Sequence, residues 1–83
     1  MAYKITFRSS VERDLKKIDK SQLKTIFEKI ETELAENPDQ FPVLTGKFSG
    51  LRKYRIGDYR VVYTLLEDTV LILRIAHRKQ AYR

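Results

Sequence analysis

A glycine–aspartate pair at positions 57 and 58 is the feature that most strongly constrains the fold of this 83-residue chain. The pair separates two runs rich in tyrosine, valine and isoleucine, residues 51–56 and 59–66. A two-residue connection that begins with glycine is typical of a type II′ β-hairpin, because glycine readily adopts the positive φ that this turn requires. The sequence therefore predicts an antiparallel hairpin in which Arg55 lies directly opposite Arg60.

The predicted register sorts the side chains of the hairpin onto two faces, because side chains alternate along a strand. One face carries the cations Lys53, Arg55 and Arg60, and the other carries Tyr54, Ile56, Tyr59, Val61 and Tyr63. The apolar face is expected to pack against the rest of the protein. Directly opposed like charges destabilise a sheet by roughly a few tenths of a kcal/mol. A bound phosphate would explain why the sequence keeps the opposed arginines, and long side chains that spread into water are the alternative.

The segment before the hairpin predicts one strand and two helices. Residues 3–7 alternate between apolar and polar types, as in a strand with one buried face. Ser9 and Asp19 each precede a glutamate or glutamine by three residues, a capping-box pattern that predicts helix starts at these positions. The apolar residues that follow are spaced for one buried helix face. The second helix is expected to end before Pro38, because proline has no amide hydrogen to donate.

A third strand-like run, residues 69–76, follows the hairpin after a polar turn. The order strand, two helices and three strands predicts an α+β fold, β-α-α-β-β-β. In this fold a helical hairpin packs on a mainly antiparallel sheet to form a two-layer sandwich. The chain contains no repeat or evident linker, so we expect residues 1–83 to form a single domain.

The composition excludes several kinds of chemistry. The chain has no cysteine and one histidine, which rules out disulfides, thiolate zinc sites and multi-histidine metal clusters. We expect no metal and no small-molecule cofactor. No apolar run approaches the ~18 residues that a membrane span needs, and the N-terminus lacks the apolar stretch of a signal peptide. The expected location is the cytoplasm, with no membrane partner.

The positive charge is concentrated in the second half of the chain. Residues 1–50 carry nine Lys and Arg against eight acids, a net +1, and residues 51–83 carry eight against three, a net +5. A concentrated positive field attracts polyanions, of which nucleic acid is the usual one. A solvated basic face or a surface for an acidic protein partner remains the alternative.

Three segments together resemble the RelE/ParE toxin superfamily of type II toxin–antitoxin systems: LRKYRI (51–56), GDYRVVY (57–63) and LRIAHRKQAYR (73–83). The resemblance covers essentially the whole chain. It implies the same β-α-α-β-β-β sandwich that the residue patterns predict. It also implies a cognate antitoxin, expected to mask the basic surface with an acidic or amphipathic helix.

The resemblance implies a set of site residues, because RelE-type members cleave messenger RNA in the ribosomal A site without a metal. Arg60 matches the phosphate-binding arginine of the family. The family type has lysine at positions 53 and 55, so Arg55 is a departure that suits charge stabilisation better than proton abstraction. The expected catalytic residues are Lys53, Arg55, Arg60, His77, Arg78 and Tyr82. Further cations expected to bind RNA are Lys47, Arg52, Lys79 and Arg83.

Three classes of function are compatible with this resemblance. The first is a ribosome-dependent endoribonuclease, in which an RNA 2′-hydroxyl attacks the adjacent phosphate. Its partners would be the ribosome, messenger RNA and the antitoxin. The second is a ParE-like toxin that inhibits DNA gyrase without cutting RNA, and the third is an inactive relative or interaction module. The presence of the full basic set at positions 53, 55, 60 and 78, together with Tyr82, favours the endoribonuclease.

Overall fold

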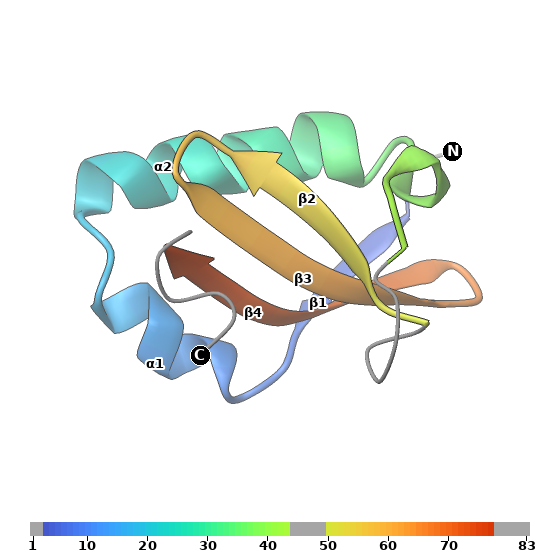
Figure 1. The fold of residues 1–83 in the computed structure, drawn as a ribbon, viewed down its shortest axis with the longest axis horizontal. Helices are drawn as coiled ribbons and strands as arrows, with labels where there is room; N and C mark the ends of the chain where they lie inside the picture. Colours follow the sequence, from blue (N-terminus) through green and yellow to red (C-terminus); the bar gives the residue numbers. More distant parts are fainter. Residues whose placement is uncertain (1–2, 44–49, 78–83) are drawn as a thin grey trace.

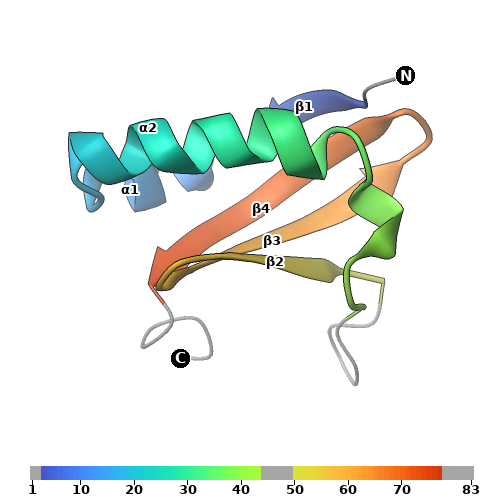
Figure 2. The same ribbon diagram turned by 90° about the horizontal axis from the view of Figure 1, so that it is seen from above.

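The computed structural model describes residues 3–43 and 50–77 of the chain. Two helices lie over one face of a twisted sheet (Figures 1 and 2). The helical elements are α1 (Val11–Lys16), α2 (Lys20–Lys29), the π-helical turn η1 (Ile30–Leu34) that continues α2, and the short 3₁₀ helix η2 (Pro38–Gln40). The strands are β1 (Lys4–Phe7), β2 (Arg52–Ile56), β3 (Tyr59–Leu66) and β4 (Thr69–His77).

The described strands form one four-stranded sheet in the order β1-β4-β3-β2. β1 pairs with β4 in parallel, and the two other pairings are antiparallel. This arrangement confirms the predicted α+β sandwich with a mainly antiparallel sheet. It also makes β2 an edge strand, since β2 pairs only with β3 within the sheet.

The hairpin register is confirmed. Gly57 has a φ of +57°, the positive value that the predicted turn needs at its first position. Ile56 pairs with Tyr59, and Arg55 pairs with Arg60. The buried side chains of the hairpin are those predicted for the apolar face: Tyr54, Ile56, Val61 and Tyr63, with Tyr59 packed against them. They meet the apolar stripe of the helices to form the core.

The helix starts differ in part from the capping-box prediction. The residue that precedes α1 is Ser10, one position later than predicted, and it makes no side-chain capping bond. Its hydroxyl instead donates to the carbonyl of Leu73 in β4, at 3.3 Å. Asp19 does precede α2 as predicted, but its side chain forms no capping bond either. The prediction of Ser9 as the residue before the helix was therefore wrong by one position. The hydrogen bond from Ser10 to β4 joins segments that are distant in the sequence, so a local pattern does not indicate it.

Helix α1 covers the part of the β4 edge that β1 leaves open. The pairing with β1 ends at Ile72. Beyond it, a carboxylate oxygen of Asp14 accepts a hydrogen bond from the Ile75 amide at 2.9 Å, and the other lies 3.7 Å from the Arg74 guanidinium. The Asp14 side chain is only 12% exposed. A carboxylate from a helix therefore takes the place that a neighbouring strand would occupy.

Replacement of Asp14 tests this contact. In Asp14→Ala the Ile75 amide loses its acceptor, which should lower the free energy of unfolding by about 1–3 kcal/mol in urea titrations. Asp14→Asn keeps an acceptor oxygen and should lose less. Hydrogen exchange at the Ile75 amide should accelerate in the alanine variant. Equal stability of both variants, with unchanged exchange at Ile75, would contradict the contact.

Candidate functional site

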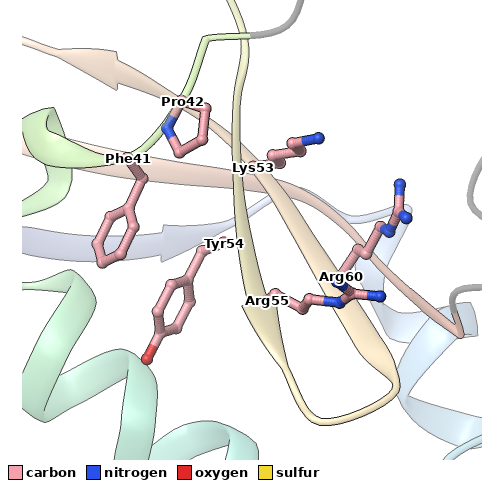
Figure 3. A pocket seen from close by; sticks show the side chains of 6 residues that line it. All are labelled: Phe41, Pro42, Lys53, Tyr54, Arg55 and Arg60. Carbon is pink, nitrogen blue, oxygen red and sulfur yellow. The ribbon is translucent and has the colours of Figure 1, made fainter.

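The structure brings together three of the predicted site residues. Lys53 and Arg55 extend from β2, and Arg60 extends from β3, on the face of the sheet away from the helices (Figure 3). Arg55 is exposed, and the other two side chains are partly exposed. The direct pairing of Arg55 with Arg60 holds two guanidinium groups on neighbouring strands. We call Lys53, Arg55 and Arg60 the cationic cluster.

The cationic cluster borders a pocket of about 320 Å³. The pocket is lined by Phe41, Pro42, Lys53, Tyr54, Arg55 and Arg60. In Figure 3 the rings of Phe41 and Tyr54 lie on one side of β2, and the cations extend to the other. Phe41 and Pro42 were not predicted as site residues, because the segment 37–50 has the composition of a connecting loop. The one sequence feature that could have pointed to a binding surface in this segment is an aromatic residue followed by a proline.

Tyr54 anchors β2 to the helical layer. Its hydroxyl donates to a carboxylate oxygen of Glu33, which also lies 3.6 Å from the Lys29 ammonium. Burial raises the pKa of Tyr54, and the bond to the Glu33 carboxylate raises it further. The same hydrogen bond lowers the pKa of Glu33. Tyr54 therefore keeps its proton near neutral pH and does not act as a proton acceptor in the pocket.

Arg52, one of the predicted RNA-binding cations, lies apart from the cationic cluster. It follows the alternation of β2 to the helix-facing side with Tyr54. Its guanidinium donates to the carbonyls of Asp39, at 3.1 Å, and Phe41, at 2.7 Å. Arg52 thus holds the loop that supplies Phe41 and Pro42 to the pocket.

His77 also lies apart from the cationic cluster. It pairs with Tyr59 across β3 and β4, and the two rings meet edge to face with centroids 5.5 Å apart. It lines a second pocket of about 240 Å³ near the end of β4, together with Asp14, Lys17 and Arg74. Since Arg60 pairs with Ala76, the side chains of Arg60 and His77 leave the sheet on opposite faces.

The other predicted site residues lie outside the described residues: Lys47, Arg78, Lys79, Tyr82 and Arg83. Their roles stay predictions. Within 3–43 and 50–77, no three or more His, Asp or Glu side chains gather in a group that could hold a metal ion. None of the helices in the described part of the chain is long and apolar enough to cross a membrane.

Comparison with known proteins identifies the family. The family model described as the ParE toxin of type II toxin–antitoxin system, parDE, matches residues 5–82. The toxin RelG of Mycobacterium tuberculosis is 31% identical over 86 residues, which cover 100% of this chain and 99% of that protein. The putative toxin RelE1 of Methanocaldococcus jannaschii is 36% identical over 89 residues, covering 100% of this chain and 98% of that protein.

A solved structure supports the same assignment. The toxin–antitoxin complex RelBE2 from Mycobacterium tuberculosis contains a chain that superposes with a TM-score of 0.88 at 30% identity, covering 94% of this chain and 100% of that one. A mutant of the Escherichia coli toxin RelE in the free state shares the fold, with a TM-score of 0.76 at 20% identity over 98% and 88% of the two chains. These matches place the chain among the toxins of type II toxin–antitoxin systems. Within that class, the chain belongs to the RelE/ParE family.

The buried Tyr63 predicts loss of stability at alkaline pH. Its hydroxyl donates to the Pro38 carbonyl, and burial raises the pKa of Tyr63 from 10.0 to about 12. Because the folded pKa lies above the unfolded one, the contribution to stability is complete below about pH 10 and is lost as the pH rises towards about 12. Urea titrations at increasing pH should show this fall.

Tyr63→Phe should be less stable at neutral pH, because the Pro38 carbonyl loses its donor, at a cost of about 0.5–1.5 kcal/mol. Its stability should depend less on pH over the alkaline range, because one ionising group has been removed. Parallel pH profiles for the variant and the wild type would show that Tyr63 does not ionise on unfolding.

Proposed function

We propose that this chain is an endoribonuclease toxin that cleaves messenger RNA in the A site of the ribosome, without a metal ion. The observation that carries the proposal is the convergence of Lys53, Arg55 and Arg60 on one pocket. No acidic residue is among the described residues that line this pocket, and its three cations give it the positive charge that attracts a phosphodiester.

The reaction needs stabilisation of charge and movement of two protons. The 2′-hydroxyl of the RNA loses its proton and attacks the adjacent phosphorus. The bond to the 5′-oxygen breaks, the leaving oxygen gains a proton, and a 2′,3′-cyclic phosphate remains. Negative charge on the phosphoryl oxygens is stabilised by Arg55 and Arg60, whose guanidinium groups stay protonated throughout. Lys53 binds the RNA backbone as a point charge.

The remaining roles fall to the end of the chain. We assign charge stabilisation to Arg78 and proton transfer to Tyr82, as the family resemblance implies. The resemblance also offers His77 for proton transfer, but its side chain leaves the sheet on the face opposite Arg60, so we favour Tyr82. A tyrosine serves as a base near neutral pH only when surrounding cations lower its pKa, and a set of arginines around the phosphate favours that change. The ribosome supplies the positioning of the codon, which can account for a large part of the barrier reduction when the catalytic groups are weakly tuned.

A cognate antitoxin is the second expected partner. The similar chain from Mycobacterium tuberculosis was solved in a toxin–antitoxin complex. The exposed cations of β2 and β3 suit an acidic or amphipathic segment of such a partner. Coverage of the cationic cluster would block the RNA and neutralise the toxin in the same step.

Inhibition of DNA gyrase is the alternative function. One observation favours it: the family model that matches this chain is described as a ParE toxin. A gyrase inhibitor has no need of a ribonuclease pocket, so the cationic cluster would then be dispensable for toxicity.

Alanine variants of the cationic cluster test the proposal. Arg60→Ala should slow messenger RNA cleavage on programmed ribosomes by roughly 10²–10³-fold, the effect of removing one stabiliser of transition-state charge. The Arg60→Ala, Arg78→Ala double variant should abolish cleavage. Arg13→Ala removes an exposed arginine from α1, remote from the pocket lining, and should cleave normally. Primer extension would locate the cuts, and a supercoiling assay would run in parallel.

The outcomes separate the classes of function. Codon-positioned cuts with normal supercoiling support the endoribonuclease. Undiminished cleavage by the double variant would overturn the mechanism. Loss of gyrase supercoiling without any cuts would select the ParE-like alternative.

A further inference from the structure

The pocket at the cationic cluster is lined by residues on both sides of β2, the edge strand of the sheet. The sheet ends at this strand, so no further strand of the sheet covers its outer side. Phe41 and Pro42 line the pocket on the side of the helical layer, and Lys53 and Arg55 line it on the other (Figure 3). The main chain of β2 therefore forms the boundary between an apolar wall and a cationic one.

The main-chain groups of Lys53 and Arg55 are directed to this outer edge. In a two-residue hairpin the residues that flank the turn, here Ile56 and Tyr59, exchange main-chain hydrogen bonds, and bonded pairs then alternate along the strands. Lys53 and Arg55 consequently fall at positions that do not bond to β3. The Lys53 amide agrees with this geometry, since it donates outward to the Pro42 carbonyl at 3.1 Å.

A proline leaves the outer edge incompletely paired. An antiparallel pair normally exchanges two hydrogen bonds, but Pro42 has no amide hydrogen to return to the Lys53 carbonyl. Among residues 3–43 and 50–77, no main-chain amide donates to the Lys53 carbonyl, and no main-chain carbonyl accepts from the Arg55 amide. Within the described residues, one main-chain acceptor and one main-chain donor, two residues apart, thus lack a main-chain partner on the edge of the strand that borders the pocket.

We propose that this edge is a subsite for a nucleobase of single-stranded RNA, next to the phosphate held by the cationic cluster. The inference rests on the proposed function. Each nucleobase presents a donor beside an acceptor on its Watson–Crick edge, which fits the Lys53 carbonyl and the Arg55 amide. Phe41 and Pro42 contact the apolar face of the base. The pocket volume of about 320 Å³ is in the range of small-ligand sites.

An extended peptide is a poorer fit to the same edge. Strand addition uses a row of open main-chain groups. Here the isolated bridge between Val43 and Arg52 occupies the start of the strand, and the turn at Gly57 ends it. Among the described residues, only the segment around Arg55 therefore lacks a main-chain neighbour on its outer side. The pocket instead matches a nucleotide. The cations bind its phosphate, and Phe41 and Pro42 contact its base.

The test compares a nucleotide with its base-free counterpart on the full chain. Adenosine 5′-monophosphate and ribose 5-phosphate are titrated into isotope-labelled protein and followed by amide resonances. The nucleotide should bind about tenfold more tightly, in line with the contribution of one stacked base. It should also shift the Arg55 amide, as expected for a donor that gains an acceptor, whereas ribose 5-phosphate should not.

Two variants address the subsite directly. Pro42→Ala supplies the missing amide hydrogen, which competes for the Lys53 carbonyl, and Phe41→Ala removes the apolar wall. Each should reduce the affinity for the nucleotide about tenfold, to that of ribose 5-phosphate, and leave the affinity for ribose 5-phosphate unchanged. Val43→Ala is the matched control, since Val43 is exposed in the same loop but does not line the pocket.

Several results would overturn the subsite. They are equal affinities of the two ligands, no binding of either one, or a shift of the Arg55 amide by an extended acidic peptide but not by the nucleotide. Failure of the subsite is distinguishable from failure of the proposed function. Base-dependent binding without cleavage on ribosomes leaves the subsite standing, and normal cleavage with equal affinities removes the subsite alone.

Discussion

The antiparallel register of β2 and β3 is the constraint on which the rest of the site depends. A two-residue turn at Gly57 fixes that register, and the register places Arg55 opposite Arg60. A shift by one residue would move the cations into the core and the tyrosines into water. The burial of Tyr54 and Tyr63 therefore stabilises the cationic cluster indirectly, because it makes every other register far less favourable.

Hydrogen bonds on the helix-facing side hold β2 and its loop in place. The Tyr54 hydroxyl binds Glu33 of η1, and the Arg52 guanidinium binds two carbonyls in the segment that carries Phe41. The helical layer thus does more than cover the sheet. It holds β2 from the helix-facing side, while the cationic cluster extends from the opposite face.

The sequence predicts the hairpin, its faces and the order of elements, because turn chemistry and period-two alternation are local properties. It does not predict that Arg52 points away from the cationic cluster to bind a loop, or that His77 packs on Tyr59 in a different pocket. Nor does it reveal Asp14 as the partner of the Ile75 amide, 61 residues away in the chain. These features arise where distant segments meet, and no local pattern encodes such meetings.

Charged residues on an edge strand, and prolines beside it, can be explained without a ligand, since they discourage pairing of the strand with other chains. Protection of the edge accounts for Lys53, Arg55 and Pro42, but it does not account for Arg60. That residue lies on β3, an interior strand with neighbours on both sides, where an arginine opposite another arginine adds repulsion and protects no edge. A ligand that neutralises both guanidinium groups would turn this pairing from a cost into a contribution. The position of Arg60 therefore favours a binding site over edge protection.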